Sequence, residues 1–249
     1  MMINMQEANN TKLYGGDFHT TRDAQTKYDA ERILSIVYRE FQGLHRVIDV
    51  GCGVGTFLCA AKAHGAKHIK GLDGNWVMQN ELVISSMDFQ SVDLSNPPPM
   101  DETYDLAINL EVAEHLAKES AEHFIQWLCN LAPVILFSAA IPGQGGVGHR
   151  NEAWLSYWVG LFGKQGFRPL DLIRPEIWGD QNIYFWYRQN TMIFIKNNRP
   201  HQIGDINFAL DIVHPELYMS KFSPKSNSLS TRLLRQIARL IKDGMQKLS

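Results

Sequence analysis

Three glycines at alternate positions follow a short apolar run, and a carboxylate follows one segment later. The run Val47–Val50 is mostly branched and apolar, as a strand covered on both faces requires, and Gly51, Gly53 and Gly55 come after it. Glycine lets the backbone turn tightly and approach a ligand closely. Asp73 ends the next apolar run, 22 residues after Gly51. A carboxylate there can bind both ribose hydroxyls of an adenosine, so the two features together predict a nucleotide-type cofactor site. The glycine spacing alone is a weak signal.

A second polar group follows a later apolar run, Tyr104–Leu110. If the chain turns helical at Glu111, then Glu111, Glu114 and His115 share one helical face. Carboxylate oxygens suit Mg²⁺ or Mn²⁺, and imidazole suits Mn²⁺, Co²⁺ or Zn²⁺. The group is therefore a candidate divalent-cation site, for which His149 offers a fourth ligand.

The same residues allow a metal-free interpretation. His115 would then only line the pocket, and Glu111 would orient the cofactor. In that case His115 or His149 is the candidate general base, because a neutral imidazole titrates near the working pH of most enzymes.

Strand-like and helix-like segments alternate along the chain, which predicts a parallel sheet with crossover helices. We expect helices over Asp23–Phe41, Thr56–His64, Glu119–Leu131 and Asn151–Gln165. We expect strands over Val47–Val50, Ile69–Asp73, Phe89–Leu94, Tyr104–Leu110, Val134–Ala140, Arg168–Arg174 and Tyr184–Ile195. Open sheets of this kind bind ligands at the carboxyl ends of their strands, where Gly51 and Glu111 stand.

The composition fits a single soluble enzyme with one core. A length of 249 residues, a formal charge of −2 and 20% charged residues predict neither disorder nor a nucleic-acid-binding surface. The three cysteines, at 52, 59 and 129, have no metal-binding spacing, so we expect a reduced, cytoplasmic protein. No apolar run approaches the roughly 20 residues of a membrane span.

The glycine loop and its downstream acid resemble the class I S-adenosylmethionine-dependent methyltransferases, over residues 45–197. The resemblance implies an α/β fold with a Rossmann-like seven-stranded sheet, mostly parallel with an antiparallel last strand, and helices on both faces. It implies that the loop faces the methionine moiety, that Asp73 faces the ribose, and that Asp93 and Leu94 lie at the adenine. The full set of expected cofactor contacts is Asp49, Gly51, Cys52, Gly53, Gly55, Thr56, Asp73, Gly74, Trp76, Asp93, Leu94 and Glu111.

Some of these assignments have structural alternatives. Asp49 is expected to hold the amino group of the cofactor through water. Trp76 either stacks on adenine or packs in the core. Asp93 either contacts adenine or caps a turn before Ser95.

Two further resemblances concern the methyl acceptor. The pattern Glu111-x-x-Glu114-His115 with a later histidine resembles the small-RNA 3′-terminal 2′-O-methyltransferases and the ubiquinone-pathway O-methyltransferases. In both groups these residues hold a metal that meets substrate oxygens, which implies Glu111, Glu114, His115 and His149 as ligands here. The segment Ile141–Trp154 resembles a loop of bacterial methyltransferases from saccharide and secondary-metabolite pathways.

We therefore expect an O-methyltransferase that transfers a methyl group from S-adenosylmethionine to a hydroxyl of a saccharide or small metabolite. An aliphatic hydroxyl is a poor acid, so a divalent cation (Mg²⁺, Mn²⁺ or Co²⁺) or a nearby histidine must assist its deprotonation. The alternatives are an RNA ribose 2′-O-methyltransferase and a non-catalytic cofactor-binding protein that regulates a partner.

The C-terminal segment differs in composition from the rest of the chain. Residues 221–249 hold seven Lys or Arg against one acid, a net charge of +6, so the rest of the chain carries −8. This negative charge argues against a nucleic-acid acceptor. Residues 232–245 have the spacing of a basic amphipathic helix, which either docks on its own domain or contacts a membrane surface, RNA or a protein partner.

These observations predict three regions. Residues 1–44 form an N-terminal segment and helix that cover the cofactor site, residues 45–197 form the methyltransferase core, and residues 198–249 form an extension that carries the basic helix.

Overall fold

The computed structural model describes residues 16–198 and 209–222. The chain separates into two compact units, residues 1–212 and residues 213–249. The described part of the second unit holds one helix, α8 (Pro215–Phe222). The basic helix predicted over residues 232–245 lies outside the described residues, as do residues 1–15 of the predicted N-terminal segment. None of the described helices is both long and apolar enough to cross a membrane.

Seven strands of the first unit form one sheet in the order β3-β2-β1-β4-β5-β7-β6. The strands are β1 (Arg46–Val50), β2 (His68–Asp73), β3 (Phe89–Ser91), β4 (Leu106–Leu110), β5 (Val134–Ser138), β6 (Phe167–Leu170) and β7 (Met192–Lys196). The first five are parallel, and β7 runs antiparallel between β5 and β6. The predicted Rossmann-like sheet, mostly parallel with an antiparallel last strand, is confirmed.

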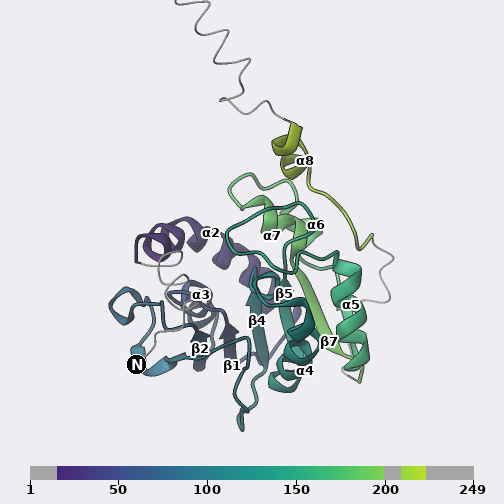
Figure 1. Ribbon diagram of the computed structural model, residues 1–249. Helices are drawn as coiled ribbons and strands as arrows, with labels where there is room; N and C mark the ends of the chain where they lie inside the picture. Colours follow the sequence, from purple (N-terminus) through teal and green to yellow (C-terminus); the bar gives the residue numbers. More distant parts are fainter. Residues whose placement is uncertain (1–15, 199–208, 223–249) are drawn as a thin grey trace, which may run out of the picture. The chain divides into compact units, whose positions relative to one another are not determined.

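Helices cover both faces of this sheet, as predicted (Figure 1). The helices in the described part of the first unit are α2 (Gly16–Glu40), α3 (Thr56–Ala63), α4 (Ala121–Leu131), α5 (Leu155–Lys164), α6 (Arg174–Ile177) and α7 (Phe185–Asn190). Short 3₁₀ turns are η1 (Gln79–Glu81), η2 (Ser86–Asp88), η3 (Ala113–His115) and η4 (Lys118–Ser120).

A hydrophobic core lies on each face of the sheet, and alternate residues of the central strands contribute to the two cores. In β1, Val47 packs with α2 and α3, whereas its neighbour Ile48 packs with α4 and α5. Successive side chains of a strand point to opposite faces, so an apolar strand can serve both layers at once. The four-residue apolar run that precedes the glycine loop is therefore explained by its position at the centre of the sheet.

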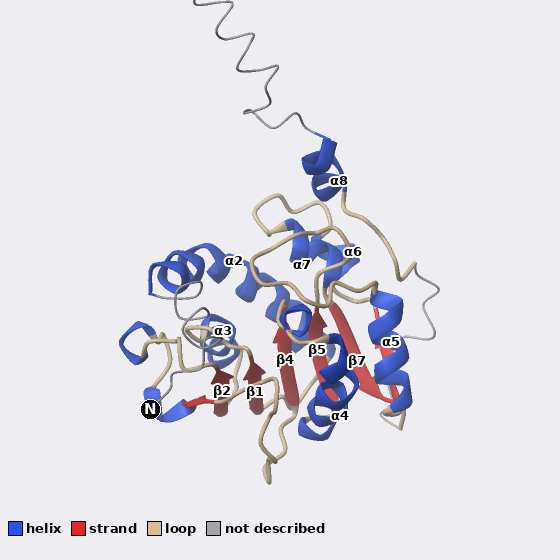
Figure 2. Cartoon of the chain, in the orientation of Figure 1, coloured by secondary structure: helices blue, strands red, loops and turns tan. Residues whose placement is uncertain are grey.

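The carboxyl ends of β4 and β5 face a group of long loops (Figure 2). The buried side chain of Asn109 in β4 donates a hydrogen bond of 2.8 Å to the carbonyl of Val50, the last residue of β1. This bond fixes the ends of two neighbouring strands against each other. The loops that leave β1 and β4 therefore start from a common, rigid edge.

Several predicted boundaries were wrong. The predicted strand Tyr184–Ile195 is a short helix, α7, followed by β7, and β6 ends at Leu170 instead of Arg174. Four consecutive residues of α7, from Tyr187 to Asn190, are buried, so this segment carries no periodic signal that separates a helix from a strand. The predicted helix Asn151–Gln165 begins only at Leu155, because the preceding residues form part of the loop after β5.

A buried ion pair supports the end of the first unit. The Arg174 guanidinium, 2% exposed, bonds the Asp171 carboxylate with its shortest contact at 2.7 Å. It also donates to the carbonyls of Ala209 and Leu210, at 2.8 and 3.1 Å. The Arg174 guanidinium thus connects the end of β6, α6 and the segment that follows the undescribed residues 199–208.

Replacing Asp171 by Ala should lower the free energy of unfolding by about 3–5 kcal/mol, because it leaves the Arg174 charge buried without its carboxylate. The exposed pair Lys164–Glu122 offers a matched control, and Glu122→Gln should cost less than about 1 kcal/mol. Urea unfolding of both variants measures the difference. An equal loss in the two variants would contradict the structural role of the buried pair.

Candidate functional site

The glycine loop wraps around the end of β2. The backbone N–H groups of Gly51 and Cys52 both donate to the carbonyl of Leu72, at 2.7 and 3.1 Å. The Asp73 carboxylate accepts from the N–H of Gly53 at 2.7 Å and from the N–H of Gly74 at 2.6 Å. The predicted loop residues and the predicted ribose acid therefore form one hydrogen-bonded unit.

Gly51 allows the loop after β1 to touch the loop after β4. Its φ is +85°, and a Cβ atom there would lie 2.2 Å from Cγ2 of Val112. Gly55, with a φ of +95°, is the N-cap residue of α3. Because glycine has no side chain, the first N–H groups of this helix receive no hydrogen bond from a capping side chain. The contact with Val112 places the glycine loop directly beside the segment that carries Glu114 and His115.

A Gly51→Ala variant should therefore lose about 2–5 kcal/mol of unfolding free energy, from left-handed strain plus the clash with Val112. Gly43 is a matched control, since it has a φ of +77° but no atom within 4 Å of the place that a Cβ atom would take. Gly43→Ala should lose only about 1–2 kcal/mol. The double variant Gly51→Ala/Val112→Ala should recover the difference in urea unfolding. Equal losses at Gly51 and Gly43 would contradict the close approach.

Two buried carboxylates stand beside the loop. Burial raises the pKa of Asp49 well above its usual range, and the negative charge of Asp73 raises it further. Burial also raises the pKa of Asp73, although hydrogen bonds from Gly53, Gly74 and the Trp76 side chain lower it in part. A positively charged ligand beside these two carboxyls would favour their ionised form and would be bound more tightly in return.

The raised pKa of Asp49 makes stability depend on pH. Between the unfolded pKa of about 3.9 and the higher folded value, the folded state binds more protons, so stability falls as the pH rises through that window. Asp49→Asn should flatten this fall in urea unfolding measured from about pH 4 to 7. Asp101→Asn, at an exposed loop position, should leave the slope unchanged. An unaltered slope in Asp49→Asn would contradict the assignment.

The other predicted cofactor contacts lie around this loop with local partners. The Trp76 ring lies against Gly74, where a Cβ atom would be 2.1 Å from Cη2 of the indole. Asp93 accepts the N–H of Ser95 at 2.9 Å, which is the turn cap considered as its alternative role. Leu94 and Thr56 are buried, and burial raises the pKa of the Cys52 thiol. Adenine contacts of Trp76, Asp93 and Leu94 remain predictions.

Glu114, His115 and His149 come together beyond the end of β4. One potential ligand atom from each lies within 4.8 Å of the other two. Nε2 of His149 is 4.0 Å from Oε1 of the fully buried Glu114, and the two imidazole rings meet edge to face at 4.8 Å. The N–H groups of Arg150 and Asn151 donate to the carbonyl of Glu114, which attaches the His149 loop to η3.

Glu111 does not join this group, and the predicted helical start at Glu111 was wrong. Its φ is +55°, the one positive value at a non-glycine residue in the part of the chain that the structure describes. The left-handed turn sends its carboxylate to the amides of Gln144 and Asn190, at 3.0 and 3.1 Å. The candidate cation site therefore has three of its four predicted ligands together.

Two sets of side chains at this site are not among the predicted catalytic, cofactor-binding or cation-binding residues. Gln144, Gln189 and Asn190 form a buried amide network around Glu111. The Glu152 carboxylate lies 2.9 Å from Nδ1 of His149. Burial raises the pKa of Glu152, but hydrogen bonds from His149 and from two loop N–H groups outweigh this and lower it, so the carboxylate is ionised at neutral pH. The separation of three residues between His149 and Glu152 is the one sequence feature that could have predicted this contact.

The sequence model of a methyltransferase-domain family matches residues 21–164, more than half of the chain. The chain belongs to this family. The match spans the glycine loop, Asp73 and the Glu114–His149 region of the methyltransferase. No curated protein matches the methyltransferase in a sequence comparison.

Solved structures similar to this methyltransferase share its fold at low sequence identity. A Haloferax volcanii protein described as a methyltransferase, in complex with the Trm112 methyltransferase activator, has a TM-score of 0.54 and 16% identity, and the match covers 75% of this chain and 97% of that one. A Nostoc punctiforme protein described as an O-methyltransferase has a TM-score of 0.53 and 13% identity, covering 72% and 59%. Human N-acetylserotonin methyltransferase in complex with S-adenosylmethionine has a TM-score of 0.51 and 14% identity, covering 76% and 56%.

Proposed function

We propose that this methyltransferase transfers the methyl group of S-adenosylmethionine to a hydroxyl oxygen of a saccharide or small metabolite. The observation that carries this proposal is the Glu114–His115–His149 cluster beside the glycine loop. The close approach of Val112 to Gly51 supports the proposal, because Val112 belongs to the segment that carries Glu114 and His115. A methyl donor on the loop would therefore stand close to groups that can handle a proton.

The residues of the loop fit S-adenosylmethionine. The donor carries a sulfonium and an ammonium group, and these cations would favour the ionised form of the buried Asp49 and Asp73 carboxyls, whose pKa is raised by burial. Glycines at 51, 53 and 55 leave room for the methionine moiety, and Asp73 suits the ribose. The human N-acetylserotonin methyltransferase, which has a similar fold, was solved with this cofactor bound.

Methyl transfer requires an acceptor oxygen in line with the sulfonium methyl and without its proton. His149 and His115 can accept that proton, because a neutral imidazole is a base near neutral pH. A divalent cation held by Glu114, His115 and His149 would lower the pKa of a bound hydroxyl and stabilise the resulting oxyanion. Two imidazoles and one carboxylate suit Mn²⁺, Co²⁺ or Zn²⁺ better than Mg²⁺, which prefers oxygen ligands.

The alternatives have less support. RNA ribose 2′-O-methylation would draw on the same Glu-x-x-Glu-His pattern, but residues 1–220 carry a charge of −8, which opposes phosphate contacts. A non-catalytic binding protein would have no need of a carboxylate and two imidazoles beside its cofactor loop. The basic C-terminal segment remains a proposed contact for a partner or a membrane surface.

The test is a methyl-transfer assay of the chelator-treated full chain with methyl-labelled S-adenosylmethionine. The acceptors are a panel of free saccharides, catechols and an RNA oligonucleotide with a 3′-terminal ribose, each with Mg²⁺, Mn²⁺, Co²⁺ or Zn²⁺ added separately. Methylation of a small hydroxyl compound supports the proposal, and a rate increase with Mn²⁺ or Co²⁺ supports cation assistance. Methylation of the RNA alone, or methylation only at nitrogen or carbon atoms of these acceptors, would contradict it.

A further inference from the structure

The Glu152 carboxylate contacts both a catalytic candidate and the glycine-rich loop after β5. Its Oε1 atom lies 2.9 Å from Nδ1 of His149 and accepts the N–H of Gly145 at 2.7 Å. Its Oε2 atom accepts the N–H of Gly143 at 2.7 Å. One side chain thus joins the histidine to two backbone positions of the loop.

The loop also packs directly on the imidazole. A Cβ atom at Gly146 would lie 2.2 Å from Nε2 of His149, so the backbone there passes close to the ring edge that faces Glu114. In the same loop, the Gln144 side-chain amide donates to Glu111 and accepts from Asn190. The ring of His149 is only 12% exposed and is enclosed by groups that are themselves anchored.

A neutral imidazole has one N–H donor and one lone pair, and its hydrogen-bond partner decides which nitrogen holds the proton. A carboxylate only accepts, so Nδ1 of His149 must be the donor to Glu152. Its Nε2 atom then presents a lone pair on the side of Glu114, 4.0 Å from Oε1.

We propose that Glu152 is a positioning residue that holds His149 as the Nδ1–H tautomer, with the Nε2 lone pair directed at the proposed cation or acceptor proton. The same carboxylate fixes the loop over the ring through Gly143 and Gly145. This inference rests on the proposed function, because it assigns His149 a partner for that chemistry. It predicts that loss of Glu152 changes the tautomer of His149 and leaves the Gly51–Gly55 loop, and therefore S-adenosylmethionine binding, unchanged.

The experiment compares Glu152→Ala, Glu152→Gln and the matched control Glu119→Ala, an exposed carboxylate on η4. Long-range ¹H–¹⁵N spectra of histidine-labelled full-length protein at about pH 8 report the tautomer of each neutral ring, and His149→Ala assigns the His149 signals. Titration with Mn²⁺ and with S-adenosylmethionine gives the two affinities.

Wild type and Glu119→Ala should show His149 as the Nδ1–H tautomer, and Glu152→Ala should lose that preference. The Mn²⁺ affinity of Glu152→Ala should fall about 10–100-fold, with S-adenosylmethionine binding changed less than about twofold. Glu152→Gln keeps an acceptor oxygen for Nδ1, so it should retain the tautomer and much of the Mn²⁺ affinity. If Glu152→Ala does not fold, Glu152→Asp, whose carboxylate is one methylene shorter, should show the same loss.

An unchanged His149 tautomer in Glu152→Ala, or in Glu152→Asp if the alanine variant is unfolded, would overturn the proposal. If wild type binds no Mn²⁺, the cation part of the proposed function fails, while the tautomer comparison still decides the role of Glu152. The two failures are therefore distinguishable.

Discussion

Replacing His149 by Ala should lower kcat of methyl transfer by about 10³-fold and change the affinity for S-adenosylmethionine by less than about twofold. His149 lies beside Glu114 and His115, beyond the end of β4, whereas the loop expected to face the methionine moiety follows β1 and the expected ribose acid, Asp73, ends β2. Its loss removes either the general base or a cation ligand. The metal-free and the cation-assisted mechanisms therefore predict the same fall in kcat. Initial rates at saturating cofactor, together with calorimetric titration, separate the two quantities.

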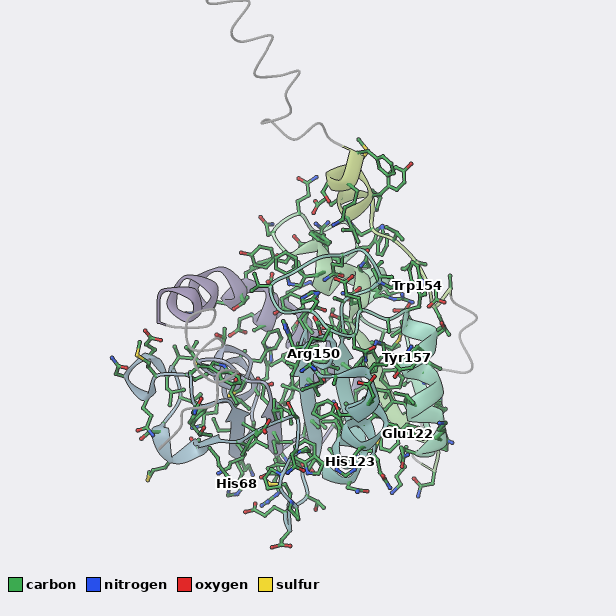
Figure 3. The ribbon with its side chains drawn as sticks, viewed as in Figure 1. His68, Glu122, His123, Arg150, Trp154 and Tyr157 are labelled. Carbon is green, nitrogen blue, oxygen red and sulfur yellow. The ribbon has the colours of Figure 1, made fainter. Side chains whose placement is uncertain are left out.

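The control for this variant is His123→Ala. His123 is an exposed residue of α4, and Figure 3 labels it apart from Arg150, the residue that follows His149. It should leave kcat unchanged within about twofold. A His149→Ala enzyme that keeps more than about a tenth of the wild-type kcat would contradict the catalytic assignment.

Replacing Asp73 by Ala should weaken S-adenosylmethionine binding by at least about 100-fold. The variant removes the expected acceptor of the ribose hydroxyls, and it also removes the acceptor of the Gly53 and Gly74 N–H groups. Each hydrogen bond to a charged group contributes about 1.5–3 kcal/mol, so the loss of the two expected bonds from the ribose hydroxyls is sufficient for this weakening of binding. Calorimetric titration of the folded variant measures it.

Asp101→Ala is the matched control for Asp73→Ala, since Asp101 is exposed on the loop before β4. Its affinity for the cofactor should equal that of wild type within about twofold. Because Asp73→Ala also leaves two backbone donors unpaired, urea unfolding should show a loss of about 2–4 kcal/mol. Wild-type cofactor affinity in a folded Asp73→Ala protein would contradict the ribose assignment.

The glycine loop and Asp73 could be predicted from the sequence because their geometry is local and repetitive. A parallel strand pair fixes the loop after β1 beside the end of β2, so the register of Val50 with Leu72 already places Gly51 near Asp73. Backbone hydrogen bonds, glycines without side chains and one carboxylate that accepts nearby N–H groups are sufficient there. Such features depend on residue type and spacing alone.

The role of Glu111 could not be predicted in the same way. A helical start would have placed it with Glu114 and His115, but a single left-handed residue redirects its carboxylate to Gln144 and Asn190. Those two partners come from loops and helices that are 33 and 79 residues away in sequence. Side-chain partners across such separations depend on tertiary packing, which no short spacing encodes.

Glu152 shows an intermediate case. It stands three residues after His149, near enough for a sequence pattern to place the two together. The pattern does not show that the same carboxylate also accepts the N–H groups of Gly143 and Gly145, because that requires the loop to fold back over the histidine.

The most direct test of the central claim is a crystal structure of the full chain grown with S-adenosylhomocysteine and Mn²⁺, with anomalous scattering used to locate the metal. Our account predicts the nucleoside on the Gly51–Gly55 loop with its ribose on Asp73, and an anomalous peak bounded by Glu114, His115 and His149. A nucleoside bound elsewhere would contradict the cofactor assignment. Manganese bound at other residues, with this cluster empty, would contradict the proposed role of the cluster as a cation site.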